Sequence, residues 1–376
     1  PPPGAGRRPM SGRPLLVGVV LVAALALALA GAAFAVARGA GGEAGPGGDA
    51  GRPNVLVVVT DDARAETLQV MPKTRRWLAD GGYRTAMAGK FLNRWSLRRP
   101  PPHFDRYAQA NGGYYDQLWQ VDGAMRRVPT YSTTFIGDQA LTYLEEFEGD
   151  DARPWFLYLA PFAPHDPGEV AALRTGQART LLSVDDLVDR VLRRLADTGE
   201  LDDTLVFYLS DNGYSWGEHR HVGKFVPYTE SIKVPFLVRW PGRLPAGTVD
   251  DRLVATVDIA PTVLDVAGIA PDPGDPVDGR SLLDGRRRER LLAEYWRDQA
   301  NAPGIRDWAA LRAAGWQYVE NYDQPGGGTF REYYDLTRDP GMERNLLADD
   351  DPGNDPPATL AAELAAARSC TGACCP

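Results

Sequence analysis

Cysteine is nearly absent from this chain. Its 376 residues include only three cysteines, all of them within the last seven positions. No thiol is therefore available to the rest of the chain, either as a core side chain or as a nucleophile. In an oxidising compartment Cys370 and Cys374 can close a small disulfide loop; the alternative is a tail with free thiols.

An excess of positive charge is also missing. The formal net charge is -9 and the pI is about 5.1, so the chain is a poor general binder of nucleic acid or anionic membranes. An anionic ligand would need a local basic pocket. The sequence shows no internal repeats. Its length suits one large α/β domain with a smaller one.

One long apolar run lies near the beginning of the sequence. Three arginines within the first 13 residues precede an uncharged run from Leu15 to Ala37. This order, with A-x-A sites at its end, is typical of a signal peptide, and the run is also long enough for an uncleaved membrane anchor. In both cases we expect export, either secretion or attachment to the outer face of the cell membrane. We assign residues 1–37 to this segment and residues 38–51 to a linker.

The stretch NVLVVVTDD, from Asn54 to Asp62, anchors the rest of the prediction. Its unbroken apolar run is typical of a strand that is buried on both faces of a parallel sheet. Two adjacent carboxylates, Asp61 and Asp62, follow directly. Because ligands of open α/β sheets bind beyond the carboxyl ends of the strands, we expect a hard divalent cation here. The alternative is that Asp62 caps a helix.

Further apolar runs predict four more strands, which we place at residues 83–88, 155–160, 205–210 and 235–240. Helical periodicity at residues 136–147, 181–195 and 256–267 separates several of these runs. This alternation predicts βαβ units, and hence an α/β fold with a mostly parallel sheet sandwiched by helices. Residues 96–134 are rich in proline, glycine and aromatics, and we expect long surface loops there.

The pattern changes from about Leu291. Alternating aromatic segments predict a small C-terminal antiparallel α+β subdomain over residues 291–357. Residues 358–376 are expected to form a short helix and the cysteine tail. The larger domain then spans residues 52–290.

Charged and amide side chains follow several predicted strands, namely Asp61, Asp62, Lys90, His165, Asp211, Asn212 and, a little later, Lys224. Three carboxylates and one amide make an all-oxygen ligand set, which suits Ca²⁺ or Mg²⁺ better than Zn²⁺. Two lysines and a histidine beside such a cation predict a pocket for an oxyanion such as sulfate or phosphate. Taken singly, Lys90 reads as a surface lysine and His165 as a turn histidine.

These motifs carry a resemblance to a known family. RPNVLVVVTDD, GYRTAMAGKFLN and the SDNG block with its downstream GK resemble the sulfatases of the alkaline-phosphatase superfamily. The pattern is most similar to the secreted N-acetylglucosamine-6-sulfatase-like branch, including KFLN, where Leu92 replaces a histidine of many sulfatases. The resemblance implies an alkaline-phosphatase-like fold and hydrolysis of sulfate esters on sulfated carbohydrates or aryl sulfates.

Residue roles also follow from the resemblance. It implies that Asp61, Asp62, Asp211 and Asn212 bind Ca²⁺, with Mg²⁺ as the alternative ion. It implies catalytic and sulfate-binding roles for Lys90, His165 and Lys224, and a weaker substrate-binding role for His219.

The sequence departs from the family at the nucleophile. The resemblance implies a formylglycine, made from Cys or Ser within C/S-x-P-S-R, and this chain has no such motif. MPKTRR runs straight into WLADGGYRTA, as if a segment were deleted between them, and residues 166–180 look shortened as well. Three functions stay open: a sulfuric ester hydrolase, a pseudoenzyme that binds metal and sulfated glycans without turnover, and a metal-dependent phosphohydrolase. The third has only Thr67 as a hydroxyl shortly after Asp62.

Overall fold

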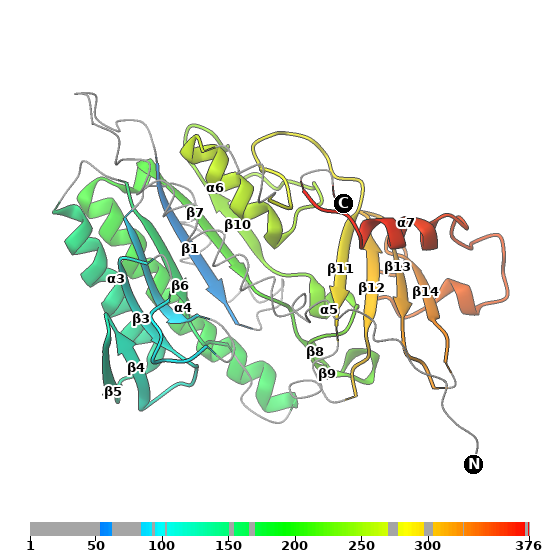
Figure 1. The fold of residues 1–376 in the computed structure, drawn as a ribbon, viewed down its shortest axis with the longest axis horizontal. Coiled ribbons are helices and arrows are strands. Elements are labelled where there is room, and N and C mark those ends of the chain that lie inside the picture. The colour runs from blue at the N-terminus through cyan, green and yellow to red at the C-terminus, as the bar shows by residue number, and fades with distance from the viewer. Residues whose placement is uncertain are drawn as a thin grey trace, which may run out of the picture.

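The computed structural model describes residues 53–61, 84–91, 95–101, 104–149, 154–164, 170–269, 277–296, 304–325, 327–372 and 375. At its centre lies an eight-stranded sheet with the order β10-β7-β1-β6-β2-β3-β4-β5 (Figure 1). The strands of this sheet are β1 (Asn54–Thr60), β2 (Thr85–Lys90), β3 (Arg106–Ala110), β4 (Gln117–Val121), β5 (Ala124–Val128), β6 (Phe156–Ala160), β7 (Thr204–Ser210) and β10 (Phe236–Arg239).

The helices of the larger domain are α3 (Ser132–Glu148), α4 (Val170–Thr198), α5 (Thr229–Ile232) and α6 (Ile259–Ala267), with short 3₁₀ turns η2 (Leu201–Asp203), η3 (Glu218–Arg220) and η4 (Thr256–Asp258). A two-stranded ribbon, β8 (Ser215–Trp216) and β9 (Val222–Gly223), lies beyond β7. The predicted helix at residues 181–195 is the C-terminal part of the longer α4.

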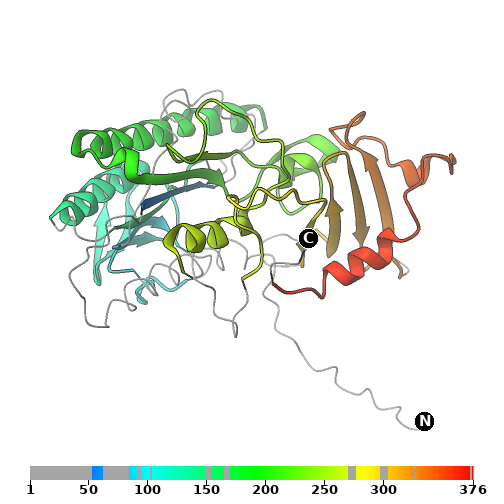
Figure 2. The same cartoon turned by 90° about the horizontal axis from the view of Figure 1, so that it is seen from above.

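The predicted α/β sandwich is confirmed. Strands β7, β1, β6, β2 and β3 pair in parallel, and β10, β4 and β5 are antiparallel additions at the two flanks. Figure 2 shows α3 and α4 on one face of the sheet and α6 on the other. Alternate residues of β1 therefore enter two cores: Leu56 and Val58 pack with α3 and α4, whereas Val55, Val57 and Val59 pack with α6.

The expectation of loops throughout residues 96–134 is wrong. Strands β3, β4 and β5 and the start of α3 lie in this range. A two-residue turn joins β4 to β5, and both of its residues, Asp122 and Gly123, have positive φ (47° and 89°). Asp-Gly is a strong hairpin signal that the Pro/Gly-rich composition obscured. The sequence of β5 shows little alternation of apolar and polar residues, because this strand lies at the sheet edge and exposes its first four residues.

The predicted antiparallel subdomain is confirmed at the C-terminal end. Its sheet has the order β11-β12-β13-β14, formed by β11 (Leu291–Tyr295), β12 (Trp308–Arg312), β13 (Trp316–Asn321) and β14 (Phe330–Asp335). The helix α7 (Leu360–Ala367) covers one face, and the segment around α5 packs on the other. A short turn, η5 (Leu346–Ala348), follows β14. The exact boundaries predicted between linker, domain and subdomain stay predictions.

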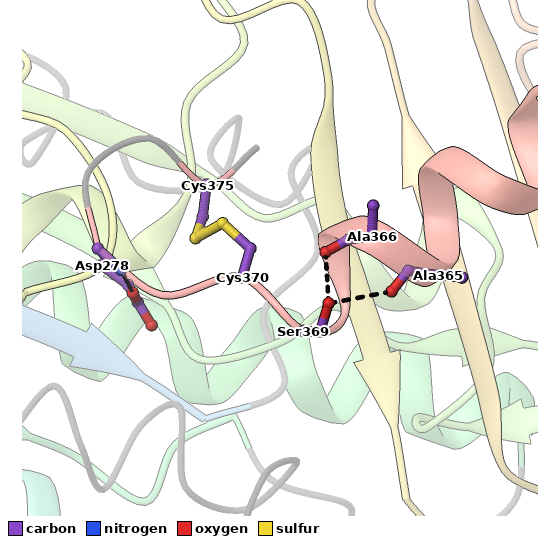
Figure 3. The surroundings of a disulfide bond; sticks show 7 residues. Asp278, Ala365, Ala366, Ser369, Cys370 and Cys375 are labelled. Atoms are coloured by element: carbon purple, nitrogen blue, oxygen red, sulfur yellow. Dashed lines mark hydrogen bonds between the residues drawn. A yellow bond between two sulfur atoms is a disulfide. The ribbon is translucent and has the colours of Figure 1, made fainter.

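The cysteine tail pairs differently from the expectation. Cys370 bonds to Cys375, not to Cys374, which lies outside the described residues (Figure 3). The backbone N–H of Cys375 donates to Gly372 O at 3.0 Å, and this turn returns Cys375 to the side of Cys370, with a Cα–Cα distance of 5.6 Å. The turn is also held by Asp278, which accepts a bond from Gly372 N–H.

Within the described ranges, no helix combines the length and the apolar composition needed to cross a membrane. The predicted signal peptide or anchor at residues 1–37 and the linker at residues 38–51 lie outside those ranges.

Candidate functional site

The candidate site lies at the carboxyl edge of the parallel strands. Asp61 follows β1, Lys90 ends β2, and Asp211 and Asn212 follow β7. Backbone hydrogen bonds tie these strand ends together: Asp211 N–H donates to Thr60 O at 3.1 Å, and Asp61 N–H donates to Ala163 O at 3.4 Å. The sheet itself therefore positions the side chains that the sequence predicted to meet.

The Asp61 carboxylate lies between two ammonium groups. Lys90 Nζ donates to Asp61 Oδ2 at 2.6 Å, and Lys224 Nζ donates to Asp61 Oδ1 at 3.4 Å. Asp61 is 4% exposed, and the lysine side chains are 19% and 17% exposed. The Lys90 bond has the short length of a charge-assisted hydrogen bond, whereas the Lys224 contact is longer and weaker. The three side chains come from β1, β2 and the loop after β9, far apart in sequence.

Asn212 connects Lys224 to the end of β7. Lys224 Nζ donates to Asn212 Oδ1 at 3.2 Å, and Asn212 Nδ2 donates to Gly213 O at 2.8 Å. The Asn212 backbone N–H donates to Asp211 Oδ1 at 2.8 Å. The Ser210 hydroxyl lies within hydrogen-bonding distance of Thr60 O and Asn212 O, at 3.0 and 2.9 Å. This network fixes the direction of the Asp211–Asn212 turn.

Two glycines allow close backbone approaches at the site. A Cβ on Gly89, whose φ is +127°, would lie 2.0 Å from Ala160 O on the neighbouring strand. A Cβ on Gly213 would lie 2.0 Å from Glu230 O in α5. A larger residue at position 89 would displace Lys90, and one at position 213 would displace the Asn212 turn. The clashing atoms belong to the backbone, which cannot move aside as a flexible side chain does.

A buried phenol lies near enough to the carboxylates to interact with them electrostatically. Tyr158 in β6 is 3% exposed. Burial raises the pKa of Tyr158 above its ordinary value, and the nearby carboxylates of Asp211 and Asp61 raise the pKa further. Tyr158 therefore adds no competing negative charge to the site at neutral pH.

The loop that carries Lys224 rests on the C-terminal subdomain. Trp308 Nε1 donates to Phe225 O at 2.7 Å, and Gln317 Nε2 donates to Pro227 O at 2.6 Å. Neither residue was predicted as part of the site. Both support the Lys224 loop from a different sheet and lie far from it in sequence, so no local sequence pattern indicates the contact. The subdomain thereby helps to fix Lys224 against Asp61.

His219 faces the subdomain. Its Nε2 lies 2.9 Å from Gly341 O, and its ring stacks on Tyr228 with ring centroids 3.7 Å apart. Glu230 Oε2 lies 3.7 Å from the same nitrogen. The substrate-binding role of His219 stays a prediction.

Two predicted site residues, Asp62 and His165, lie outside the described residues, as does Thr67. Among the residues that the structure describes, no three His, Cys, Asp or Glu side chains lie close enough together to bind a metal ion. Of the four predicted ligands, Asp62 lies outside the described residues and Asn212 is an amide, so only the carboxylates of Asp61 and Asp211 are among those side chains. The donor chemistry fits a hard cation, because two carboxylates and an amide oxygen meet at one sheet edge. A cation there would compete with the two lysines for Asp61.

Family models match most of the described chain. The model described as "Sulfatase" matches residues 75–269, just over half of the chain. The model described as "N-sulphoglucosamine sulphohydrolase, C-terminal" matches residues 217–369. The two matches overlap in the segment that carries Lys224.

Curated relatives agree with these matches. N-acetylglucosamine-6-sulfatase of Homo sapiens is 30% identical over 367 residues, covering 72% of this chain and 65% of the relative. The Capra hircus protein of the same name is 28% identical, covering 72% of this chain and 64% of the relative. This chain thus spans just under two thirds of their length. A Drosophila melanogaster "Extracellular sulfatase SULF-1 homolog" is 28% identical over 63% of this chain and 26% of the relative.

Solved structures share the fold. One, a complex with its substrate D-glucosamine-2-N,6-O-disulfate, has a TM-score of 0.68 and 19% identity and covers 84% of this chain and 96% of that chain. A phosphonate monoester hydrolase of Agrobacterium radiobacter has a TM-score of 0.59 and 18% identity, covering 84% and 94%. At these identities the likeness concerns the fold, and it confirms the predicted alkaline-phosphatase-like architecture.

Proposed function

Because this chain belongs to the sulfatase family, we propose that its strand-end site binds the sulfate group of a sulfated sugar and that the chain acts as a sulfuric ester hydrolase. The names of relatives support this substrate class: the human relative is an N-acetylglucosamine-6-sulfatase, and one fold neighbour was solved with a disulfated glucosamine. Aryl sulfates share the same ester group and are the simpler substrates of the same class.

The observation that carries the proposal is the pairing of Lys90 and Lys224 around Asp61. In an acidic chain, two half-buried ammonium groups at one sheet edge would supply the local positive charge that an anion requires once a cation neutralises Asp61. Their charge would stabilise the sulfate oxygens as the ester bond to the sugar breaks. His165, the third predicted sulfate ligand, would add a donor or a proton to the leaving sugar oxygen.

Calcium is the cofactor that we propose for this site. Asp61, Asp211 and Asn212 would hold the ion together with Asp62, and Mg²⁺ is the alternative ion. When bound, the ion would supply positive charge to the sulfate oxygens. Lys90 would then turn from Asp61 towards the sulfate, because the ion and the lysine compete for the same carboxylate.

A second function is binding without turnover. The specific observation in its favour is the absence of C/S-x-P-S-R from the sequence. Without that nucleophile no covalent sulfo-enzyme intermediate forms. The alignment with the human relative points the same way: it runs over 367 residues but covers only 72% of this chain, so the relative carries segments that this chain lacks.

We also propose export. Arginines followed by the apolar run from Leu15 to Ala37 support it, and so does the extracellular sulfatase named among the relatives. Fusion of residues 1–60 to a reporter that is active only outside the cytoplasm tests this proposal. Reporter activity supports export, and its absence contradicts it.

Incubation of the purified chain with glucosamine 6-sulfate and Ca²⁺ separates the two functions. Release of inorganic sulfate, measured by ion chromatography and lost in Lys224→Ala, supports the hydrolase. Binding of the sugar in calorimetry without any sulfate release supports the pseudoenzyme. Neither binding nor release would contradict both. Arg338→Ala, an exposed change in the C-terminal subdomain, is the matched control.

A further inference from the structure

Aromatic rings form a continuous series that begins beside Lys90 and ends in solvent. Lys90 Nζ lies 5.8 Å from the centroid of the Phe162 ring. Tyr114 packs edge-on to Phe162 at 5.3 Å, and Tyr131 stacks parallel to Tyr114 at 5.7 Å. Tyr115 follows at 5.1 Å from Tyr131. We call these four rings the aromatic strip.

The fold places the strip at the same sheet edge as the candidate site. Phe162 follows β6, and the loop with Tyr114 and Tyr115 follows β3, a strand parallel to β2 and β6. All of these segments leave the carboxyl edge from which Asp61 and Lys90 come. The strip therefore extends the site sideways along the sheet, towards the β3 flank.

Specific contacts hold the strip in place. A Cβ on Gly112 would lie 2.5 Å from the Phe162 ring, so the glycine lets this loop approach Phe162. Ser132 N–H, at the start of α3, donates to Tyr114 O at 2.7 Å. Gln117 Nε2 donates to Tyr115 O, also at 2.7 Å. The rings are thus presented by an ordered loop, which lowers the entropy cost of binding a ligand.

Burial against neighbouring side chains accounts for the presence of three of the rings, but not for that of Tyr115. Phe162, Tyr114 and Tyr131 are half-buried, whereas Tyr115 is 64% exposed. It is the most exposed aromatic side chain among the large exposed hydrophobics of the described residues. Tyr115 therefore presents an exposed ring face, at the end of a series that begins beside the candidate site, on which a ligand can pack.

We propose that the aromatic strip binds the sugar rings that follow the sulfated sugar in an oligosaccharide, so that the preferred ligand is an oligosaccharide rather than a monosaccharide. This proposal rests on the function proposed above. The faces of a sugar ring carry C–H groups and its rim carries hydroxyls, which match the apolar face and polar tip of tyrosine.

The charge beside the strip favours an uncharged ring as its occupant. Asp116 and Arg127, next to Tyr115, bind each other through two hydrogen bonds of 2.7 Å each. This pair leaves no net charge to select a second sulfate there. The anionic group of the ligand is bound at Lys90 and Lys224, and the oligosaccharide runs along the strip so that one of its uncharged rings packs on Tyr115.

The test compares two probes in calorimetry with the full chain: glucosamine 6-sulfate, and a tetrasaccharide that carries one 6-O-sulfated glucosamine. Tyr115→Ala should weaken tetrasaccharide binding about three- to tenfold, the range expected for loss of one aromatic stacking partner. It should leave binding of the monosaccharide unchanged. Tyr115→Phe keeps the ring and should retain most of the tetrasaccharide affinity.

Phe330→Ala is the matched control, because Phe330 is a half-exposed aromatic of the C-terminal sheet. It should leave both affinities unchanged. Equal affinity of the wild type for the two probes would overturn the role of the strip, as would an unchanged tetrasaccharide affinity in Tyr115→Ala. If the wild type bound neither probe, the sulfated-sugar function itself would fail, and that result is distinct from the first two.

Discussion

Removal of the Lys90 ammonium should destabilise the fold through Asp61. In Lys90→Met the side chain keeps its length and its apolar packing, but the 2.6 Å bond to Asp61 Oδ2 is lost. Asp61 is almost fully buried, so its charge loses a partner that water cannot readily replace. Lys224 remains 3.4 Å from the other oxygen and limits the loss.

The expected cost follows from these distances. A hydrogen bond to a charged group contributes about 1.5–3 kcal/mol, and complete loss of a partner from a buried ion pair costs about 3–5 kcal/mol. Because a second lysine stays in contact, Lys90→Met should lower the free energy of unfolding by about 2 kcal/mol. Ca²⁺ should reduce this cost, since the ion would supply positive charge to the same carboxylate.

A double-mutant cycle with Asp61→Asn is the assay, measured by urea denaturation with EDTA and then with excess Ca²⁺. We expect a coupling energy of about 1–2 kcal/mol between the two positions in EDTA. The exposed pair Arg127 and Asp116 is the control, and its coupling should be smaller because both side chains are largely exposed. A coupling energy near zero between Asp61 and Lys90 would refute the reasoning.

Three further predictions follow from the site. Asp211→Ala should abolish the rise in melting temperature that Ca²⁺ produces; an unchanged rise would remove Asp211 from the ligand set. Gln317→Leu removes the donor to Pro227 O and one of the acceptors of Arg312, so it should cost about 1–3 kcal/mol in urea denaturation and weaken sulfate binding; unaltered sulfate affinity would contradict the bracing of Lys224. The raised pKa of Tyr158 means that its contribution to stability is complete below about pH 10 and is lost as the pH rises further, because only the unfolded tyrosine ionises there. Urea denaturation at increasing alkaline pH should therefore give a shallower decline in Tyr158→Phe, and identical declines would argue against this role.

The sequence predicted the centre of the site because its signals are local. The run from Val55 to Val59 is apolar throughout and Thr60 is β-branched, so the pattern predicted a strand buried on both faces with Asp61 at its end. Lys90 and Asp211 follow strands of the same kind. Parallel strands share one carboxyl edge, and that rule alone brings these side chains together.

The remainder depends on contacts between distant segments. Gln317 and Trp308 brace the Lys224 loop from another sheet, and no motif marks them. His219 lies in a 3₁₀ turn with a φ of +52°, and its ring stacks on Tyr228, which spacing in the sequence does not specify. The aromatic strip joins a loop after β3 to one after β6, so it becomes visible only when the order of the strands is known.

The most direct test of the central claim is a calorimetric titration of glucosamine 6-sulfate, in Ca²⁺, into the wild-type chain and into Lys224→Ala. The account predicts binding by the wild type, at least tenfold weaker binding by the folded variant, and no binding of unsulfated glucosamine. Equal affinity of the two proteins for the sulfated sugar would contradict it, because the strand-end lysines would then not be the sulfate site.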